Sequence, residues 1–251
     1  MEGGQKIGIC GRTGSGKSSL MVSLFRVEHL TQGQIFIDGI DIASVPLAIL
    51  RRKLGIIPQD PVMFSASVRF NLDPFGEHTD EAIWKAIGQA QMTEHIMSLP
   101  GKLDEEVAEG GENFSAGQRQ LICIARALLR NPKILVLDEA TASIDNATDN
   151  LIQDMVKDAF KDCTVLTIAH RLHTIIDSDK ILVLDAGNMA EYDSPVSLLA
   201  KEGAEENQAT FAALWSRHQA AHKTTKAVSN DNLSALVDAE KKKSRDDLAS
   251  M

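Results

Sequence analysis

A single short stretch constrains the fold of this chain more than any other. Residues 11–18 read Gly-Arg-Thr-Gly-Ser-Gly-Lys-Ser, which matches the phosphate-loop pattern of Gly, any four residues, and Gly-Lys-Ser/Thr at every fixed position. An apolar run at residues 6–10 precedes it, and a run suited to a helix follows at residues 17–26. The pattern therefore predicts a strand that turns through glycines into a helix.

Such a turn has a specific chemistry. Its glycines permit positive φ and bring successive backbone N–H groups together, while the following helix points its positive end at the same place. Lys17 suits the β- and γ-phosphates of a nucleoside triphosphate, and the hydroxyl of Ser18 suits Mg²⁺. A ligand-free glycine turn is the alternative, but the complete pattern favours a nucleotide site. The residues expected to surround the phosphates are Gly11, Arg12, Thr13, Gly14, Ser15, Gly16, Lys17, Ser18 and Ser19.

Composition limits the class of protein. The chain has 251 residues, of which 43% are hydrophobic, enough for one sizeable α/β domain or two small ones. The sequence shows neither a membrane-spanning apolar stretch nor a leader, so we expect other polypeptide to carry the chain to any membrane. A net charge of -9 argues against a bulk nucleic-acid partner. Cys10, Cys123 and Cys163 lie in apolar runs and are expected to be buried free thiols.

The remaining pattern predicts an alternation of strands and helices. Strands are expected at residues 6–10, 54–57, 134–137, 164–168 and 181–184, with a further hairpin strand at 188–193. Residues 34–39 are expected to form an antiparallel strand that ends in a tight turn at Gly39. Helical spacing covers residues 60–101, and a helix with Ser115 as N-cap runs to about residue 130. Phe211, Leu214 and Trp215 indicate a docked helix. We expect a domain over residues 1–215 with a helical subdomain at about 60–130, then a polar tail at 216–251, either a solvated face or disordered, with a contact to acidic lipid less favoured.

Two further segments carry chemistry. Asp138 and Glu139 follow the apolar residues 134–137, and paired carboxylates at the end of a buried strand can hold Mg²⁺ and polarise an attacking water. The alternative for this pair is a helix-start cap. Ser115, Gly117 and Gln118 lie at a helix start, which is a second anion site by the same dipole argument. One domain does not need two such sites, whereas two copies facing each other do.

These motifs together resemble the nucleotide-binding domain of an ABC transporter over about residues 1–215. The motifs are residues 11–18, Gln59, the signature Phe114-Ser115-Ala116-Gly117-Gln118, Leu137-Asp138-Glu139, Ser143-Ile144-Asp145 and His170, in that order. The resemblance implies a P-loop NTPase of the α/β class, with a mainly parallel central sheet, antiparallel edge strands and a helical subdomain. It also implies ATP and Mg²⁺ as ligands.

The resemblance assigns roles to individual residues. Glu139, His170, Gln59 and Lys17 would act in ATP hydrolysis, and Ser18, Gln59 and Asp138 would contact the metal. Ser115, Gly117 and Gln118 would bind the nucleotide held by a second domain, and Asp145 would cross that dimer interface. The implied partners are a second nucleotide-binding domain in a head-to-tail dimer and transmembrane domains. The implied location is the cytoplasmic face of a membrane, and the implied function is substrate export.

Details of the signature point to one branch of the family. The opening Phe-Ser, the following Gly-Gln-Arg-Gln and the segment Asn71-Leu72-Asp73-Pro74-Phe75 resemble the second nucleotide-binding domain of the C subfamily, the multidrug-resistance-associated type. Ala116 stands where the common signature has glycine, and its methyl group lies where backbone should approach phosphate. This implies one competent and one weakened ATP site in the full dimer.

One departure from the family concerns the start of the chain. The family stacks adenine on an aromatic residue from strands ahead of the phosphate loop, and those strands are missing here; Tyr192, the only tyrosine, is far downstream. Loss of such a stacking contact costs about 1 to 3 kcal/mol. The alternatives to an active exporter domain are therefore a regulatory nucleotide sensor that gates a channel, a soluble protein that acts on ribosomes or DNA, and an inactive truncated fragment.

Overall fold

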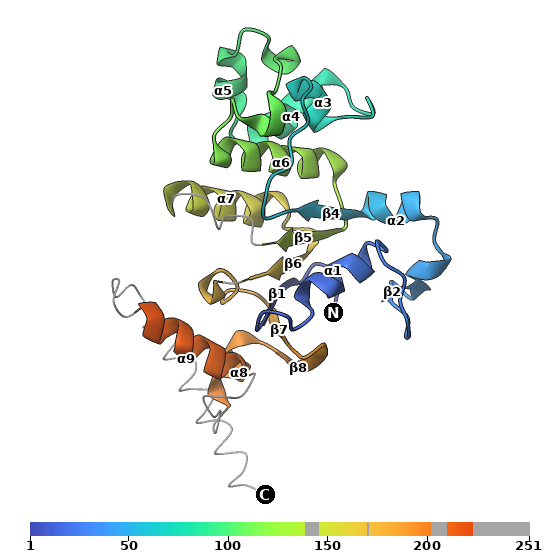
Figure 1. Ribbon diagram of the computed structural model, residues 1–251, viewed down its shortest axis with the longest axis vertical. Helices are drawn as coiled ribbons and strands as arrows, with labels where there is room; N and C mark the ends of the chain where they lie inside the picture. The colour runs from blue at the N-terminus through green and yellow to red at the C-terminus, as the bar shows by residue number, and fades with distance from the viewer. Residues whose placement is uncertain (139–145, 170, 202–209, 223–251) are drawn as a thin grey trace, which may run out of the picture. The chain divides into compact units, whose positions relative to one another are not determined.

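The computed structural model of the chain describes residues 1–138, 146–169, 171–201 and 210–222 (Figure 1). These residues form two compact units. The first contains residues 5–29 and the part of the chain from Leu166 onward, and the second contains residues 2–4 and 30–165. The boundary falls inside strand β6 (Thr164–Ile168). Each unit has its own hydrophobic core and is described separately.

The first unit is built on parallel and antiparallel strand pairs. Strand β1 (Lys6–Gly11) pairs in parallel with β7 (Lys180–Asp185), with Ile9 opposite Leu182. Strand β8 (Asn188–Asp193) pairs antiparallel with β7 through a tight turn, as the predicted hairpin requires. The backbone N–H of Ala169, just after β6, donates to the carbonyl of Ile9 at 3.0 Å. Helix α1 (Lys17–Leu24) follows β1, which confirms the predicted strand-turn-helix.

Two C-terminal helices complete the core of this unit. They are α8 (Pro195–Ala200) and α9 (Phe211–His222). Phe211 is fully buried, and its ring stacks on that of Trp215 at a centroid distance of 6.2 Å. The predicted docked helix is confirmed, and it continues beyond Trp215 to His222. The buried core residues are Cys10, Ala169, Leu172, Ile175, Ile181, Val183, Leu198, Phe211 and Trp215.

The second unit also contains parallel and antiparallel strand pairs. Strand β4 (Leu54–Ile57) pairs with β5 (Ile134–Asp138), with Ile57 opposite Leu137. The predicted turn at Gly39 joins two very short antiparallel strands, β2 (Phe36–Ile37) and β3 (Ile40–Asp41). Helix α2 (Leu47–Lys53) leads into β4, and α7 (Asn146–Ala159) follows β5 along the chain. Parallel pairs with antiparallel edge strands confirm the α/β fold class.

Helices dominate the rest of the second unit. Figure 1 shows α3 (Val68–Leu72), α4 (Asp80–Gln89), α5 (Thr93–Ser98) and α6 (Ala116–Arg130) gathered together, and α6 contacts both α3 and α4. Of the apolar positions predicted from helical spacing, Ala82 and Leu99 are partly buried, and the others are buried: Ile83, Ala86, Ile87, Met92 and Ile96. Helix α6 ends where Asn131 adopts a left-handed conformation with φ of 44°. Helices therefore occupy the predicted segment, but the first of them begins only at Val68, and residues 60–67 are not helical.

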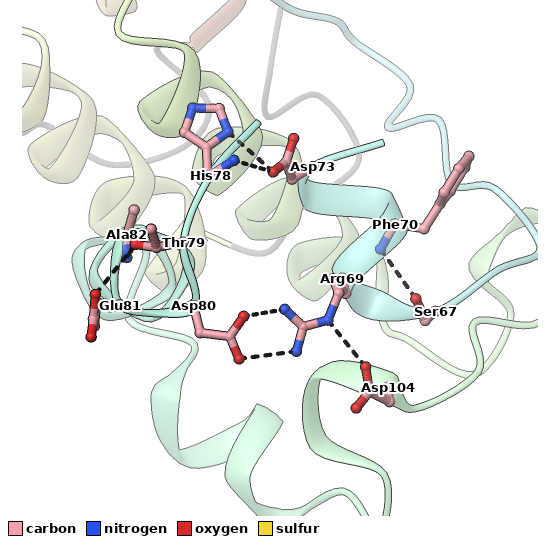
Figure 2. A network of polar contacts seen from close by, with 10 residues as sticks. All are labelled: Ser67, Arg69, Phe70, Asp73, His78, Thr79, Asp80, Glu81, Ala82 and Asp104. Carbon is pink, nitrogen blue, oxygen red and sulfur yellow. Dashed lines mark hydrogen bonds and ion pairs between the residues drawn. The ribbon is translucent and has the colours of Figure 1, made fainter. Parts of the chain in front are cut away.

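Arg69 connects three pieces of this helical segment (Figure 2). Its guanidinium group, on α3, makes a bidentate contact with Asp80 at the start of α4. Its Nε also donates to Asp104 at 3.1 Å, in a short 3₁₀ helix (Lys102–Asp104). The hydrogen bond from Arg69 holds the pKa of Asp80 below its ordinary value. Because these groups are largely exposed, we expect the network to fix geometry more than to add stability.

Asp73 carries a buried carboxylate beside this network. Its Oδ2 accepts from the backbone N–H of His78 at 2.7 Å and lies 3.3 Å from His78 Nδ1 (Figure 2). Burial alone would raise the pKa of Asp73, but the hydrogen bonds from the backbone at His78 and Glu77 outweigh it, so the pKa is lowered. A pKa lower in the folded than in the unfolded state gives stability that is present above the unfolded value and lost as pH falls through the folded one.

Asp73→Asn is therefore expected to reduce the free energy of unfolding by about 1 kcal/mol at neutral pH, since hydrogen bonds to a charged group are replaced by neutral ones. The difference from wild type should begin to shrink as the pH falls below about 4, because the unfolded wild-type chain then takes up a proton at Asp73 while the folded chain, in which the pKa of Asp73 is lowered, does not. Urea unfolding at a series of pH values measures it, with the exposed Asp162→Asn as control. A difference that stayed constant down to pH 3 would contradict this role of Asp73.

Candidate functional site

The phosphate loop lies wholly within the first unit. It leaves β1 at Gly11 and enters α1 at Lys17, with Gly16 as N-cap at φ of 104° and no side-chain cap. Gly14 also has positive φ, at 79°, and a Cβ there would have no atom within 4 Å. The loop therefore presents bare backbone and an uncapped helix start, which suits an anion.

Lys17 is folded back over this loop. Its side chain is buried, with 7% of the residue exposed, and Nζ donates to the carbonyls of Gly11 at 2.9 Å and Arg12 at 3.1 Å. An ammonium group has three donors, so these contacts leave one N–H for an oxygen of a ligand. The two carbonyls hold the cation at the loop before any ligand arrives.

Ser15 supplies a second sign of a ligand site. Its Oγ is buried and has no hydrogen-bond partner among the residues that the structure describes. Its backbone carbonyl accepts from the N–H of Gly187 at 3.0 Å, which lies in the turn between β7 and β8. A buried hydroxyl without a partner, in the same loop as a buried ammonium group, fits an anionic oxygen ligand. The contact with Gly187 was not predicted, because the hairpin turn gives no signal of its neighbour.

Cys10 lies just before the loop and stays uncharged. Burial raises the pKa of its thiol to about 12, and the nearby Lys17 cation offsets only part of this effect. The residue therefore places no negative charge next to the phosphate loop at neutral pH. Cys123 and Cys163 are buried as well, as their apolar neighbours predicted.

Gly11 is expected to be the least tolerant glycine of the loop. A Cβ at this position would overlap the carbonyl oxygen of Leu184 and lie 2.6 Å from Ser15 Oγ, and its φ is 152°. Gly11→Ala should lower the free energy of unfolding by at least about 2 kcal/mol. The matched control is Gly33→Ala, where φ is 80° and no atom lies within 4 Å. Thermal unfolding of both variants measures the two decreases in the free energy of unfolding. Equal decreases would contradict the prediction, because the overlap at Gly11 would then have no cost of its own.

The remaining loop residues are accessible from solvent. Arg12, Thr13 and Gly14 are exposed, and so are Ser18 and Ser19 in the first turn of α1. Exposure leaves the Ser18 hydroxyl available to a metal ion, as the motif predicts. Residues 11–19 therefore form one continuous loop and helix start in the first unit, with Ser15 and Lys17 buried and the residues around them accessible.

Two predicted residues of the second unit lie at the same sheet edge. Asp138 is the last residue of β5, and Gln59 follows the end of the adjacent strand β4. Ile57 lies opposite Leu137, so the carboxyl ends of these parallel strands coincide. Gln59 is exposed and Asp138 is partly buried. Ligand sites of α/β sheets form at the carboxyl ends of parallel strands, where both of these side chains begin.

The signature segment forms the start of α6. Ser115 is the N-cap, and its Oγ accepts from the Gln118 N–H at 3.2 Å. Gln118 Oε1 in turn accepts from the Ser115 N–H at 2.8 Å, which completes a capping box and confirms the predicted cap. Gln118 Nε2 also lies 3.4 Å from Nδ1 of His95, a residue that no sequence pattern singled out. Gly117 lies in the first turn of the helix and is partly buried, whereas Ser115 is exposed.

Several predicted residues lie outside the part of the chain that the structure describes. They are Glu139, Ser143, Ile144, Asp145 and His170. Their assignments remain predictions from the sequence. In the described ranges, none of the helices combines the length and the apolar character needed to cross a membrane.

The fold and the loop define this chain as an α/β protein with a phosphate loop. The family model for the ABC transporter matches residues 1–142. The chain is 55% identical to ATP-binding cassette sub-family C member 3 of Rattus norvegicus over 203 residues, which are 81% of this chain and 13% of that protein. It is 57% identical to sub-family C member 4 of Homo sapiens over 195 residues, 78% of this chain and 15% of that protein.

A solved structure gives the same result. A bacterial Atm1-family ABC exporter with ATP bound superposes with a TM-score of 0.77 at 38% sequence identity, covering 86% of this chain and 37% of the exporter chain. The chain therefore belongs to the ABC transporter family, and its similarity to sub-family C proteins agrees with the branch predicted from the signature. It spans less than a sixth of the length of these curated relatives.

Proposed function

We propose that this chain binds ATP with Mg²⁺ at residues 11–18 and hydrolyses it as the nucleotide-binding domain of an export transporter. The observation that carries the proposal is the phosphate loop, in which the buried Lys17 ammonium group, the unpartnered Ser15 hydroxyl and the uncapped start of α1 occur together. The solved relative with ATP bound supports the choice of nucleotide. The relatives named as cassette proteins and as an exporter support the coupling to transport.

The roles of the residues follow from their chemistry. Lys17 offsets the charge of the β- and γ-phosphates, and backbone N–H groups at the start of α1 donate to the same oxygens. Ser18, Gln59 and Asp138 have the oxygen atoms that Mg²⁺ prefers. The bound metal would neutralise phosphate charge that develops during hydrolysis. Glu139 would accept the proton of the attacking water, and His170 would contact the γ-phosphate.

The signature segment supports a proposal about the partners. Ser115 is exposed at the start of a long helix, where an anion is stabilised. We assign it, with Gly117 and Gln118, to the nucleotide held by a second nucleotide-binding domain in a head-to-tail pair. Transmembrane domains of the same transporter would hold the pair at the cytoplasmic face of a membrane. Ala116 adds a methyl group at this contact, which would weaken the site formed by this signature.

Release of phosphate from Mg·ATP by the purified chain tests the proposal. We expect a slow release that requires Mg²⁺ and rises more than linearly with protein concentration, because each site is completed by a second domain. Removal of Mg²⁺ by a chelator should abolish it. A folded chain that bound ATP without releasing phosphate at any protein concentration would contradict the assignment as a hydrolase and leave a nucleotide sensor.

A further inference from the structure

Gln120 makes a buried contact that none of the roles above uses. It lies on α6, only 1% of the residue is exposed, and its Nε2 donates to the backbone carbonyl of Pro58 at 3.3 Å. Pro58 follows β4 directly and precedes Gln59. Helix α6 packs against β4 within the second unit (Figure 1). One side chain therefore joins the helix that begins with the signature to the loop that carries Gln59.

The orientation of this amide group follows from its neighbour. A backbone carbonyl can only accept, so the Gln120 nitrogen and not its oxygen must face Pro58. Gln120 Oε1 is then buried and has no hydrogen-bond partner among the residues that the structure describes. A buried polar group with an unsatisfied atom costs free energy that an apolar side chain of the same size would not. Packing alone therefore does not account for glutamine at this position.

The same side chain is well placed relative to the signature. Gln120 lies three and four residues after Gly117 and Ala116, and such residues share one face of a helix. The capping box of Ser115 and Gln118 makes the start of α6 a fixed frame. The helix rises about 7 Å from Ser115 to Gln120 at its standard pitch. A shift of the signature segment would therefore be carried along the helix to the carbonyl of Pro58.

We propose that Gln120 is a positioning residue that ties the signature helix to the loop of Gln59, so that contact of Ser115 with a ligand sets the position of Gln59. This inference rests on the proposed function, which places Gln59 at the metal. Gln120 itself touches neither nucleotide nor metal in this scheme. It acts through the backbone of Pro58.

The test compares Gln120→Met with wild type in the full chain. Methionine has a similar volume and no donor, so the link to Pro58 is lost while the core stays filled. The control is Gln89→Met, which makes the same change at the exposed last residue of α4. We expect hydrogen exchange of backbone amides at residues 54–62 to become several-fold faster in Gln120→Met without nucleotide, and to be unchanged in Gln89→Met. Unchanged exchange in Gln120→Met would overturn the proposal.

Kinetics separate positioning from a structural role. In Gln120→Met we expect kcat to fall about tenfold with KM for Mg·ATP changed less than twofold, because residues 11–18 are intact and only alignment is lost. In a Gln59→Ala background, Gln120→Met should not lower kcat further, since Gln120 acts through Gln59. The same tenfold loss in both backgrounds, or a rise in KM alone, would overturn the proposal.

A second variant at position 120 and a readout that does not depend on hydrolysis complete the test. Gln120→Leu also fills the core and has no donor for the Pro58 carbonyl, so it should reproduce the faster exchange if Gln120→Met does not fold. Slow exchange at residues 54–62 in a folded Gln120→Leu chain would refute the link. If wild type releases no phosphate, the proposed function fails, and the exchange comparison still decides whether Gln120 holds the loop.

Discussion

Lys17→Ala is expected to weaken Mg·ATP binding by about 10- to 100-fold, because it removes a charge-assisted hydrogen bond to phosphate worth about 1.5 to 3 kcal/mol. The ammonium group is already buried at the loop, where the carbonyls of Gly11 and Arg12 hold it. The ligand therefore meets an ordered cation and loses little in arranging it. An equilibrium titration of both chains with Mg·ATP measures the difference.

The control for this substitution is Lys85→Ala, which removes an exposed lysine from α4. It should leave the affinity unchanged. The far-ultraviolet circular dichroism of Lys17→Ala should match wild type, since the loss of binding must not come from unfolding. Equal affinities of Lys17→Ala and wild type would show that the nucleotide, if bound, lies elsewhere.

Glu139→Gln should lower the rate of ATP hydrolysis by about 10²- to 10⁴-fold while leaving the affinity for Mg·ATP within about threefold of wild type. Glutamine keeps the shape of the side chain but accepts no proton from water. This prediction rests on the sequence, where Glu139 directly follows Asp138 at the end of β5. Single-turnover phosphate release measures the rate.

The matched control for this variant is Glu94→Gln, an exposed carboxylate in the first turn of α5. We expect it to hydrolyse ATP as wild type does. If Glu139→Gln retained more than a tenth of the wild-type rate, another group would have to activate the water. His170 would then be the first alternative, because it is predicted to lie at the γ-phosphate and a neutral imidazole can accept a proton.

The parts of this fold that the sequence predicts are those determined by local chemistry. The phosphate loop requires glycines at fixed positions, so its strand, turn and helix follow from the spacing alone. The start of α6 is equally local, because Ser115 and Gln118 satisfy each other within one turn. The turn at Gly187 belongs to a hairpin whose first strand, β7, has a clear apolar run.

Contacts between distant residues were not predictable from the sequence. The hydrogen bonds of Gly187 to Ser15 and of Gln120 to Pro58 join segments that no local pattern relates. No sequence pattern indicated the role of Arg69 either, although its side chain joins α3 to Asp80 and Asp104. Such contacts depend on how elements pack, and propensity and periodicity carry no information about that.

An apolar run alone does not determine which faces of a strand are buried. Continuous apolar runs are typical of strands covered on both faces, and residues 181–184 are all buried. In β4, however, Ile56 is 38% exposed while Leu54 and Ile57 are buried. An apolar residue in a short strand shows that the strand is suited to a sheet, but not that both of its faces are covered.

The claim that residues 11–18 hold a nucleotide is tested most directly by calorimetric titration of the wild-type chain with ATP in the presence of Mg²⁺. We predict saturable binding with a dissociation constant on the order of micromolar to low millimolar. A folded chain that showed no saturable binding at low millimolar ATP would contradict the claim.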